Sequence, residues 1–225
     1  LSLHDALPIS CRAIADRSRA IVVSVDYRLA PEHPYPAAVD DAYAALLWVR
    51  ANGKLLNADP SKIAVAGDSA GGNLAAAVCL MARDRGGPAI AFQALIYPGL
   101  DSAHLDTDSY RFFGTGYMLN KANIERFIAM YLPDKRDRIS PYASPLLARS
   151  HANLPPALVI TAGFDVLRDE GEAYVKKLND AGVRARASRY PGVIHAFVSA
   201  PKLLPQATRA IDEIAAELKK AFGGN

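Results

Sequence analysis

Short apolar runs recur along the chain, with amphipathic segments between several of them. Runs rich in apolar and β-branched residues predict strands at 20–27, 63–67, 91–97, 157–163 and, more weakly, 184–190. All but the last are almost continuously hydrophobic, which is typical of strands buried on both faces of a parallel sheet. The pattern therefore predicts a mostly parallel sheet with helices packed against it.

Helical spacing of apolar residues predicts the helices that flank this sheet. One helix is expected to begin after Pro36 and to end at Asn52, and another covers 169–181, where Gly182 is well suited to end it. Alternating strands and helices predict an α/β fold with right-handed crossovers. The apolar stripes are formed by Val39, Tyr43, Leu46 and Leu47 in the first helix, and by Ile211, Ile214, Ala215, Leu218 and Phe222 in a helix near the C-terminus.

The connection between the third and fourth predicted strands is unusually long. Residues 101–150 are rich in aromatic side chains and poor in strand character, and 121–132 has a helical pattern. A connection of this length exceeds an ordinary αβ loop, so it needs a role of its own. We expect it to form a cap over a substrate pocket. The alternative is a helical elaboration packed on the core.

The first ten residues require an interpretation separate from the rest of the chain. Residues 1–10 back-translate, in one frame, to a widely used sequencing-adapter primer, and the chain starts with Leu1 instead of methionine. We therefore expect this segment to be foreign to the protein, and the native N-terminal part to be missing. The alternative is an ordinary start of a helix. The length of 225 residues and the 51% hydrophobic content favour one globular domain over 11–225.

Charge and cysteine content narrow the classes of partner. The 26 basic and 23 acidic residues are scattered, without the basic block that follows a phosphate backbone, so a nucleic acid is not expected. No apolar run approaches the roughly 20 residues that span a bilayer. Cys11 and Cys79 have no disulfide pattern, which favours reduced thiols and a cytoplasmic location. A homodimer remains open.

The strongest chemical motif follows the second predicted strand. The sequence G-D-S-A-G-G at 67–72 lies between that strand and a helix-like segment, which is the context of a nucleophile elbow. Such a turn exposes a serine hydroxyl, and Gly67 and Gly71 are expected to let the strand and helix approach each other. Ser69 is therefore the predicted nucleophile, and the Ala70 N–H is expected to donate to an oxyanion. The alternative is a glycine-rich turn without chemistry.

A serine nucleophile needs a base and an acid that orients the base, and this fold places them in the order Ser, Asp or Glu, His. Asp165 lies in F-D-V-L-R-D-E-G at the carboxyl end of the fourth predicted strand and is the predicted acid. Its rivals Asp169 and Glu170 are interpreted as first-turn residues of the next helix. His195 follows the last predicted strand, whereas no other histidine lies beyond it, so His195 is the predicted base.

At these motifs the chain resembles the hormone-sensitive-lipase-like carboxylesterases, bacterial family IV, from about Cys11 to the last helix. The resemblance rests on V-D-Y-R-L-A-P-E-H-P-Y-P-A-A-V-D-D at 25–41, and on G-D-S-A-G-G, P-Y-A-S-P-L and D-V-L-R-D-E-G. It implies an α/β-hydrolase fold with a partial cap and the same Ser-Asp-His assignment. One small departure is Ala196, because the family usually has glycine after the catalytic histidine.

A larger departure is an absent motif. The family carries an H-G-G-G loop upstream whose amides complete the oxyanion hole, and this sequence does not occur in the chain. Loss of one oxyanion donor typically lowers turnover by about 10²–10³, so we expect low activity. Family topology also places a strand between the runs at 20–27 and 63–67. We therefore expect the first strands to be missing, a gap in the sheet, and poor solubility from unpaired edges.

The resemblance and the predicted triad together imply hydrolysis of short to medium acyl esters. The partner is then a small-molecule ester, and neither a metal nor a cofactor is required. An amidase or a lactonase on the same three residues is one alternative, which a substrate panel would separate. A ligand receptor on the same scaffold is another, because fold alone does not fix function. Binding without turnover would indicate the receptor.

Overall fold

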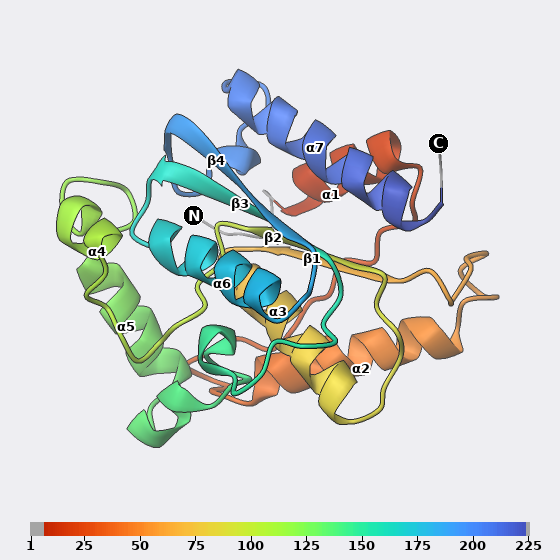
Figure 1. Cartoon of the computed structure of the whole chain (residues 1–225), viewed down its shortest axis with the longest axis horizontal. Helices are drawn as coiled ribbons and strands as arrows, with labels where there is room; N and C mark the ends of the chain where they lie inside the picture. The colour runs from red at the N-terminus through yellow and green to blue at the C-terminus, as the bar shows by residue number, and fades with distance from the viewer. Residues whose placement is uncertain (1–6, 224–225) are drawn as a thin grey trace.

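A parallel sheet forms the centre of the molecule, between two layers of helices (Figure 1). The structure is a computed structural model that describes residues 7–223. Each neighbouring pair of strands is parallel, in the order β1-β2-β3-β4. The carboxyl ends of the strands therefore meet at one edge of the sheet. The strands are β1 (Ala64–Asp68), β2 (Phe92–Ile96), β3 (Ala157–Phe164) and β4 (Ala185–Ile194).

Helices cover both faces of the sheet, which confirms the α/β class. One face packs against α1 (Leu7–Ser18) and α7 (Pro205–Ala221), and the other against α3 (Ala70–Asp84) and α6 (Arg168–Asp180). The helix α2 (Ala37–Ala51) lies on the outer side of α3. Because both faces are covered, Ala94 and Leu95, on opposite faces of β2, are completely buried. This double burial explains the unbroken hydrophobicity of the central strands.

The predicted helices are present, with one difference in the buried face of α2. The helix α2 follows Pro36, and α6 is followed by Gly182 with a positive φ of 77°, as its sequence signals indicated. Leu47, however, is 43% exposed, and its neighbour Trp48 is 46% exposed. The face that packs on α3 keeps three of the four predicted residues and has Ala38 in place of Leu47. It contains Ala38, Val39, Tyr43 and Leu46.

The prediction of a strand at 20–27 is wrong. These residues form no ladder with β1 or with any other described segment, and Ile21, Val22 and Val23 are 54%, 37% and 41% exposed. β-branched residues favour a pleated, half-buried surface, but a strand also needs a neighbouring backbone to bond with. Among the described residues, β1 pairs with β2 alone, so the sheet ends at β1. The expected gap between two strands is not observed, because the first of those strands is not formed.

We expect this free edge to make the chain self-associate. Unpaired N–H and C=O groups along β1, together with the exposed side chains of 21–23, offer a template for another chain. Sedimentation velocity should show species larger than a monomer that grow with concentration, and Val22→Lys should reduce them. The matched control is Leu55→Lys, at a 76% exposed position in a loop, which should have little effect. A cooperative thermal melt of a stable monomer would contradict the prediction.

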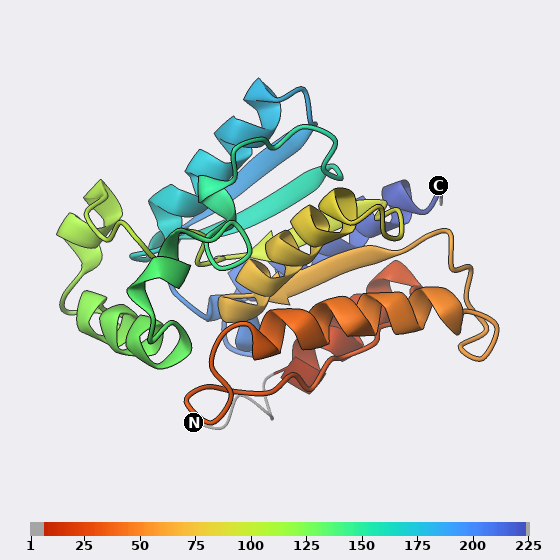
Figure 2. The ribbon, with the colours of Figure 1, turned by 90° about the horizontal axis from the view of Figure 1, so that it is seen from below.

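The long connection 101–150 divides into two parts. Figure 2 shows α4 (Asp108–Phe113) and α5 (Lys121–Tyr131) beyond the carboxyl ends of the strands. The later short turn Pro145–Leu147, in contrast, contacts α3 and α6 and belongs to the core. Only the earlier part is therefore placed to form the predicted cap, which stays a prediction.

The expectations about the N-terminal segment stay predictions. Of the segment 1–10, residues 1–6 lie outside the described part, and 7–10 begin α1. Between residues 7 and 223, none of the helices has the length and apolar character required to cross a membrane.

Candidate active site

The connection from β1 to α3 is a strained turn with a serine at its tip. Ser69 has φ 53° and ψ −116°, a conformation that non-glycine residues rarely adopt, and its N–H donates to Ile96 O at 2.9 Å. A Cβ on Gly67 would lie 2.1 Å from Gly71 O, and one on Gly72 would lie 2.8 Å from Pro98 Cβ. Glycine is therefore required at these two positions, by close approach of the backbone at Gly67 and of the rigid proline ring at Gly72.

The expected packing role of Gly71 is wrong. A Cβ built on Gly71 would have no neighbour within 4 Å, so this position faces open space beside the serine. The strand and helix crowd together at Gly67, whereas Gly72 packs against the loop after β2. The motif indicated which segment would be tight, but the choice among its glycines depends on the contacts that each one makes.

We expect Gly67→Ala to destabilise the fold strongly. The new methyl would meet backbone atoms, which cannot rotate away, and overpacking of this kind costs about 1–3 kcal/mol or more. The matched control is Gly71→Ala, which adds the same methyl in open space and removes a glycine from α3, with an expected gain of about 0.5–1 kcal/mol. Urea unfolding of both variants measures the difference. Equal midpoints would contradict the prediction.

The structure brings the three predicted triad residues together. Ser69, Asp165 and His195 each directly follow a strand, namely β1, β3 and β4, so all lie at the carboxyl edge of the sheet. His195 Nδ1 is 2.7 Å from Asp165 Oδ2, and His195 Nε2 is 2.9 Å from Ser69 Oγ. Asp165 and His195 are 1% and 7% exposed.

This arrangement has the geometry of a general base next to a hydroxyl. With the proton on Nδ1, the imidazole of His195 donates to Asp165, and its Nε2 can accept the proton of Ser69. The other oxygen of Asp165, Oδ1, accepts the N–H of Leu167 at 3.0 Å, which fixes the carboxylate plane. Each group therefore has an orienting partner.

The rival carboxylates are bound elsewhere, in the first turn of α6 as interpreted from the sequence. Asp169 Oδ2 accepts the N–H of Ser109 at 2.7 Å, and its Oδ1 accepts from Arg168 Nε at 2.8 Å. Glu170 is buried, and its Oε2 accepts two backbone N–H groups of the loop after β2. Burial raises the pKa of Glu170 well above its usual value. Both carboxylates therefore organise the loops around the site.

The amide expected to stabilise an oxyanion lies beside the serine. Ala70 is the first residue of α3, and its N–H has no acceptor among the described residues. A helix N-terminus carries a positive partial charge, so a negative oxygen near Ser69 Oγ would be stabilised there. The position agrees with the predicted role of Ala70, which stays a prediction.

Comparison with known proteins identifies the family. A model of the alpha/beta hydrolase fold matches residues 3–199. The chain belongs to this family. It is 44% identical to the carboxylesterase NlhH of Mycobacterium tuberculosis (strain ATCC 25618 / H37Rv) over 99% of this chain and 69% of that protein. It is 39% identical to an arylesterase of Saccharolobus solfataricus over 93% of this chain and 68% of that protein.

Solved structures of esterases have the same fold as this α/β hydrolase. An esterase from Pyrobaculum calidifontis superposes with a TM-score of 0.91 at 50% identity, over 94% of this chain and 69% of that chain. A thermostable esterase from Pseudomonas putida superposes with a TM-score of 0.93 at 43% identity, over 97% of this chain and 69% of that chain. The resemblance inferred from the sequence motifs is thereby confirmed.

The departure at Ala196 falls on an unusual backbone conformation in this α/β hydrolase. Ala196 has φ 65° and ψ 13°, in the left-handed region that favours glycine. A left-handed conformation costs an L-residue about 1–2 kcal/mol. The chain therefore holds strain in the residue next to the predicted base.

We expect Ala196→Gly to stabilise the fold. Relief of the strain outweighs the extra unfolded-state entropy of glycine, about 0.4–1 kcal/mol, and leaves a net gain of about 0.5–1 kcal/mol. Ala200→Gly is the matched control, because Ala200 has φ −120° and no strain to relieve, so it should lose stability. Urea midpoints of both variants provide the measurement, and a destabilised Ala196→Gly would be contrary to expectation.

Further polar residues border the site of this hydrolase without having been predicted from the sequence. Asn73, in α3, donates through Nδ2 to Gly99 O at 2.8 Å and to Ala143 O at 2.9 Å. Burial raises the pKa of Asp68, and the nearby His195 opposes that shift. The signal for Asn73 was a polar residue at the start of an otherwise apolar helix. Within residues 7–223, no cluster of three or more His, Cys, Asp or Glu side chains is placed to hold a metal ion.

Proposed function

We propose that this chain is a serine carboxylesterase that hydrolyses short to medium acyl esters, with Ser69 as nucleophile, His195 as base and Asp165 as acid. The observation that carries the proposal is the unbroken pair of short contacts, 2.7 and 2.9 Å, that links these side chains beside a strained turn. The names of the relatives, carboxylesterase and arylesterase, support the ester class.

The reaction follows from these contacts. Ser69 Oγ attacks the ester carbonyl carbon while His195 Nε2 takes the hydroxyl proton, and the carbonyl oxygen becomes an oxyanion beside the Ala70 N–H. The C–O bond to the alcohol breaks, and the alcohol leaves with the proton from His195. Water then attacks the acyl-serine and gives its proton to the same nitrogen. Collapse releases the carboxylic acid and returns the proton to Ser69.

Asp165 acts through the imidazole in this scheme. Its carboxylate holds the tautomer with the proton on Nδ1 and stabilises the positive charge that the His195 ring acquires in each half of the reaction. The carboxylate is buried, and its second oxygen is already occupied by the Leu167 N–H. The base is therefore oriented before a substrate arrives, which lowers the reorganisation needed in the transition state.

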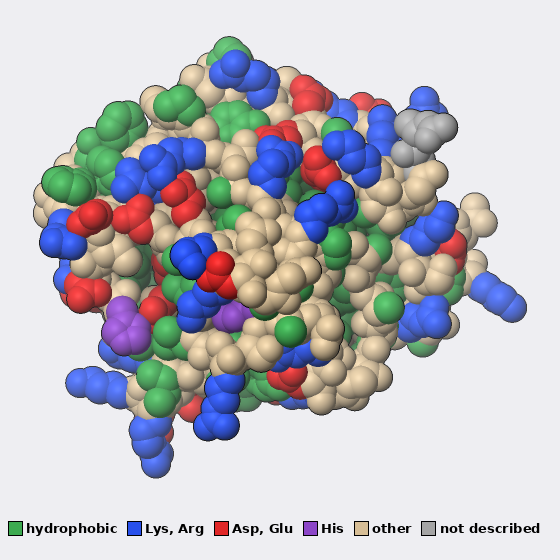
Figure 3. Space-filling model, viewed as in Figure 1, with side chains coloured by type: hydrophobic (Ala, Val, Ile, Leu, Met, Phe, Trp, Pro, Cys, Tyr) green, Lys and Arg blue, Asp and Glu red, His purple; other side chains and the backbone are tan. Residues whose placement is uncertain are grey.

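The first part of the segment 101–150 is proposed as the cap. Ser109, in α4, donates its hydroxyl to Val166 O at 2.6 Å, next to the acid. Phe113 and Tyr117 pack against the ring of Phe164, the residue before the acid. In Figure 3, hydrophobic side chains gather at the end of the molecule where α4 lies. An apolar acyl or alcohol group would therefore meet an apolar surface at this end.

Location and assembly remain part of the proposal. Cys11 and Cys79 are unpaired, which supports the reducing, cytoplasmic setting proposed from the sequence. A homodimer is expected to be visible in the same sedimentation experiment that tests self-association. A single monomeric species at all concentrations would exclude it.

The direct test uses a serine-directed fluorophosphonate and a panel of p-nitrophenyl esters. We expect the probe to attach to Ser69, as located by peptide mass, and no attachment in His195→Ala, because the serine then has no base. Hydrolysis should be faster for acetyl and butyryl esters than for long-chain esters. Faster turnover of anilides or lactones would instead indicate the amidase or lactonase. Absence of both label and turnover in the folded chain would refute the proposal.

A further inference from the structure

The residue that directly follows each strand has a special place in this molecule. After β1, β3 and β4 these residues are Ser69, Asp165 and His195, and after β2 the residue is Tyr97. The carboxyl ends of all four strands meet at one edge of the sheet, so Tyr97 lies in the same row as the triad. It is the member of this row to which the proposed reaction assigns no role.

The backbone of Tyr97 is strained. Its φ is +36°, although tyrosine has a bulky side chain that disfavours this region. The N–H of Tyr97 continues the ladder by donating to Ile160 O at 2.7 Å, and the side chain is 1% exposed. A strained residue persists where its surroundings determine its conformation, and such residues cluster at functional sites. The question is therefore what the tyrosine ring contacts.

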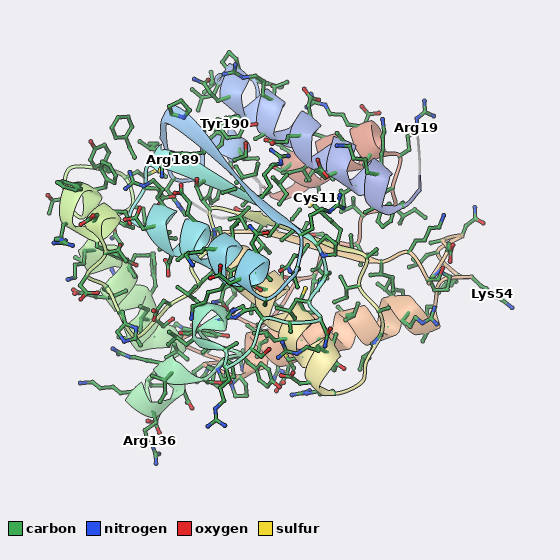
Figure 4. The ribbon with its side chains drawn as sticks, in the orientation of Figure 1. Cys11, Arg19, Lys54, Arg136, Arg189 and Tyr190 are labelled. Carbon is green, nitrogen blue, oxygen red and sulfur yellow. The ribbon has the colours of Figure 1, made fainter. Side chains whose placement is uncertain are left out.

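The ring of Tyr97 packs against the imidazole of His195. The two ring centroids are 4.6 Å apart, with an angle of 56° between the planes. Phe197 packs edge-on against Tyr97 at 5.9 Å, and Tyr190 packs against Phe197 at 5.3 Å. Tyr190 in turn reaches from β4 to α7 (Figure 4), where its hydroxyl donates to Glu213 at 2.7 Å. A row of aromatic rings thus supports the imidazole from the sheet to α7.

The hydroxyl of Tyr97 does not take part in this contact. It is buried, and the polar groups beside it belong to Val198 and Ser199. Burial also raises the pKa of Tyr97, so the phenol stays neutral. The part of the side chain that acts on the site is therefore the ring.

We propose that Tyr97 is a positioning residue whose ring holds the His195 imidazole in the orientation that joins Asp165 Oδ2 to Ser69 Oγ. The inference rests on the proposed function. The bond from Asp165 fixes one nitrogen of the imidazole but leaves the ring free to turn about that contact. The Tyr97 ring, packed against the imidazole, restricts this rotation and keeps Nε2 at 2.9 Å from Ser69 Oγ. A displacement of about 1 Å at such a contact can lower the rate about 10²-fold.

The kinetic test compares Tyr97→Phe with Tyr97→Leu. Phenylalanine keeps the ring, so kcat for p-nitrophenyl butyrate should stay close to that of the unsubstituted chain. Leucine removes the aromatic ring that packs against the imidazole, so kcat should fall about 10²-fold with little change in KM. The matched control is Tyr174→Leu, at a completely buried tyrosine that packs against His151 on the other face of the sheet. It should lower the melting temperature as Tyr97→Leu does, without the loss in kcat.

A second readout does not depend on activity. The proton shared by His195 Nδ1 and Asp165 should give a low-field proton NMR signal, assigned by its loss in His195→Ala. We expect Tyr97→Leu to broaden or shift this signal while the rest of the spectrum remains folded, and Tyr97→Phe and Tyr174→Leu to preserve it. If the folded chain shows neither labelling nor turnover, the proposed function fails, and the low-field signal still tests the role of Tyr97.

Two outcomes would overturn the role of Tyr97. In the first, Tyr97→Leu retains both kcat and the low-field signal, which would show that the ring does not hold the imidazole. In the second, Tyr97→Phe loses as much kcat as Tyr97→Leu, which would place the effect in the hydroxyl. A parallel loss in Tyr174→Leu would also count against it, because the effect would then follow general loss of packing.

Discussion

Ester hydrolysis is expected to fall to the background rate when Ser69 is replaced by alanine. The substitution removes the only oxygen within hydrogen-bond reach of His195 Nε2 among the described side chains, at 2.9 Å. Where a nucleophile and its base act as a unit, loss of either one lowers kcat by about 10⁶-fold. The Ala70 N–H and the imidazole remain, but neither can form the acyl intermediate. Initial rates of p-nitrophenyl butyrate hydrolysis measure the effect, with heat-denatured protein as the blank for the background rate.

The control for this variant is Ser188→Ala. Ser188 lies in β4 and donates to Glu213, away from the proposed chemistry, so its loss should leave hydrolysis largely intact. Far-UV circular dichroism of both variants should match the unsubstituted chain. Persistent turnover by folded Ser69→Ala would assign the nucleophile to another residue.

The second large effect is expected for Asp165→Asn. The asparagine oxygen can keep the bond from the Leu167 N–H, which turns the amide NH₂ toward His195 Nδ1. That nitrogen must then accept a hydrogen bond, so the imidazole carries its proton on Nε2 and can no longer receive one from Ser69. A change of tautomer of this kind lowers kcat by about 10⁴-fold. Because the change is nearly isosteric, the melting temperature should change little.

Asp169→Asn is the matched comparison for the acid. Its amide oxygen can still accept the Ser109 N–H, and its side chain makes no bond to His195, so most of the turnover should survive. Steady-state kinetics of the two variants on the same ester distinguish the carboxylates. Similar losses in both would mean that the acid has been assigned to the wrong loop.

The sheet was predictable where burial left a clear trace in the sequence. The strands β2 and β3 are covered on both faces, and this coverage forces the continuous apolar runs from which they were inferred. The run at 20–27 is also largely apolar but has no partner strand among the described residues, and pairing cannot be inferred from a run alone. Leu47 fits the apolar spacing of α2 yet is exposed, because the position of α3 sets which residues are covered.

The candidate site was predictable because its motifs are local and follow a fixed order. Ser69 and Asp165 lie just beyond the apolar runs 63–67 and 157–163, and His195 lies on the loop after the run 184–190. The fold brings the ends of those segments together. Tyr97 gave no such signal, because it is the last residue of the predicted strand 91–97, and its contact with His195 depends on the strained turn. Ser109 gave no signal, since its importance arises only when α4 packs beside the acid loop.

The hydrogen bond of the Ser109 hydroxyl links the proposed cap to the triad, so substrate size is expected to affect kcat as well as affinity. It donates a hydrogen bond from α4 to the carbonyl of Val166. The N–H of the same peptide group, that of Leu167, donates to the Asp165 carboxylate. If α4 covers the substrate as proposed, a bulky ester would push this helix outward and displace the peptide that orients the Asp165 carboxylate. Poorly fitting substrates should therefore turn over slowly even when bound, so that selectivity is expressed in the chemical step as well as in affinity.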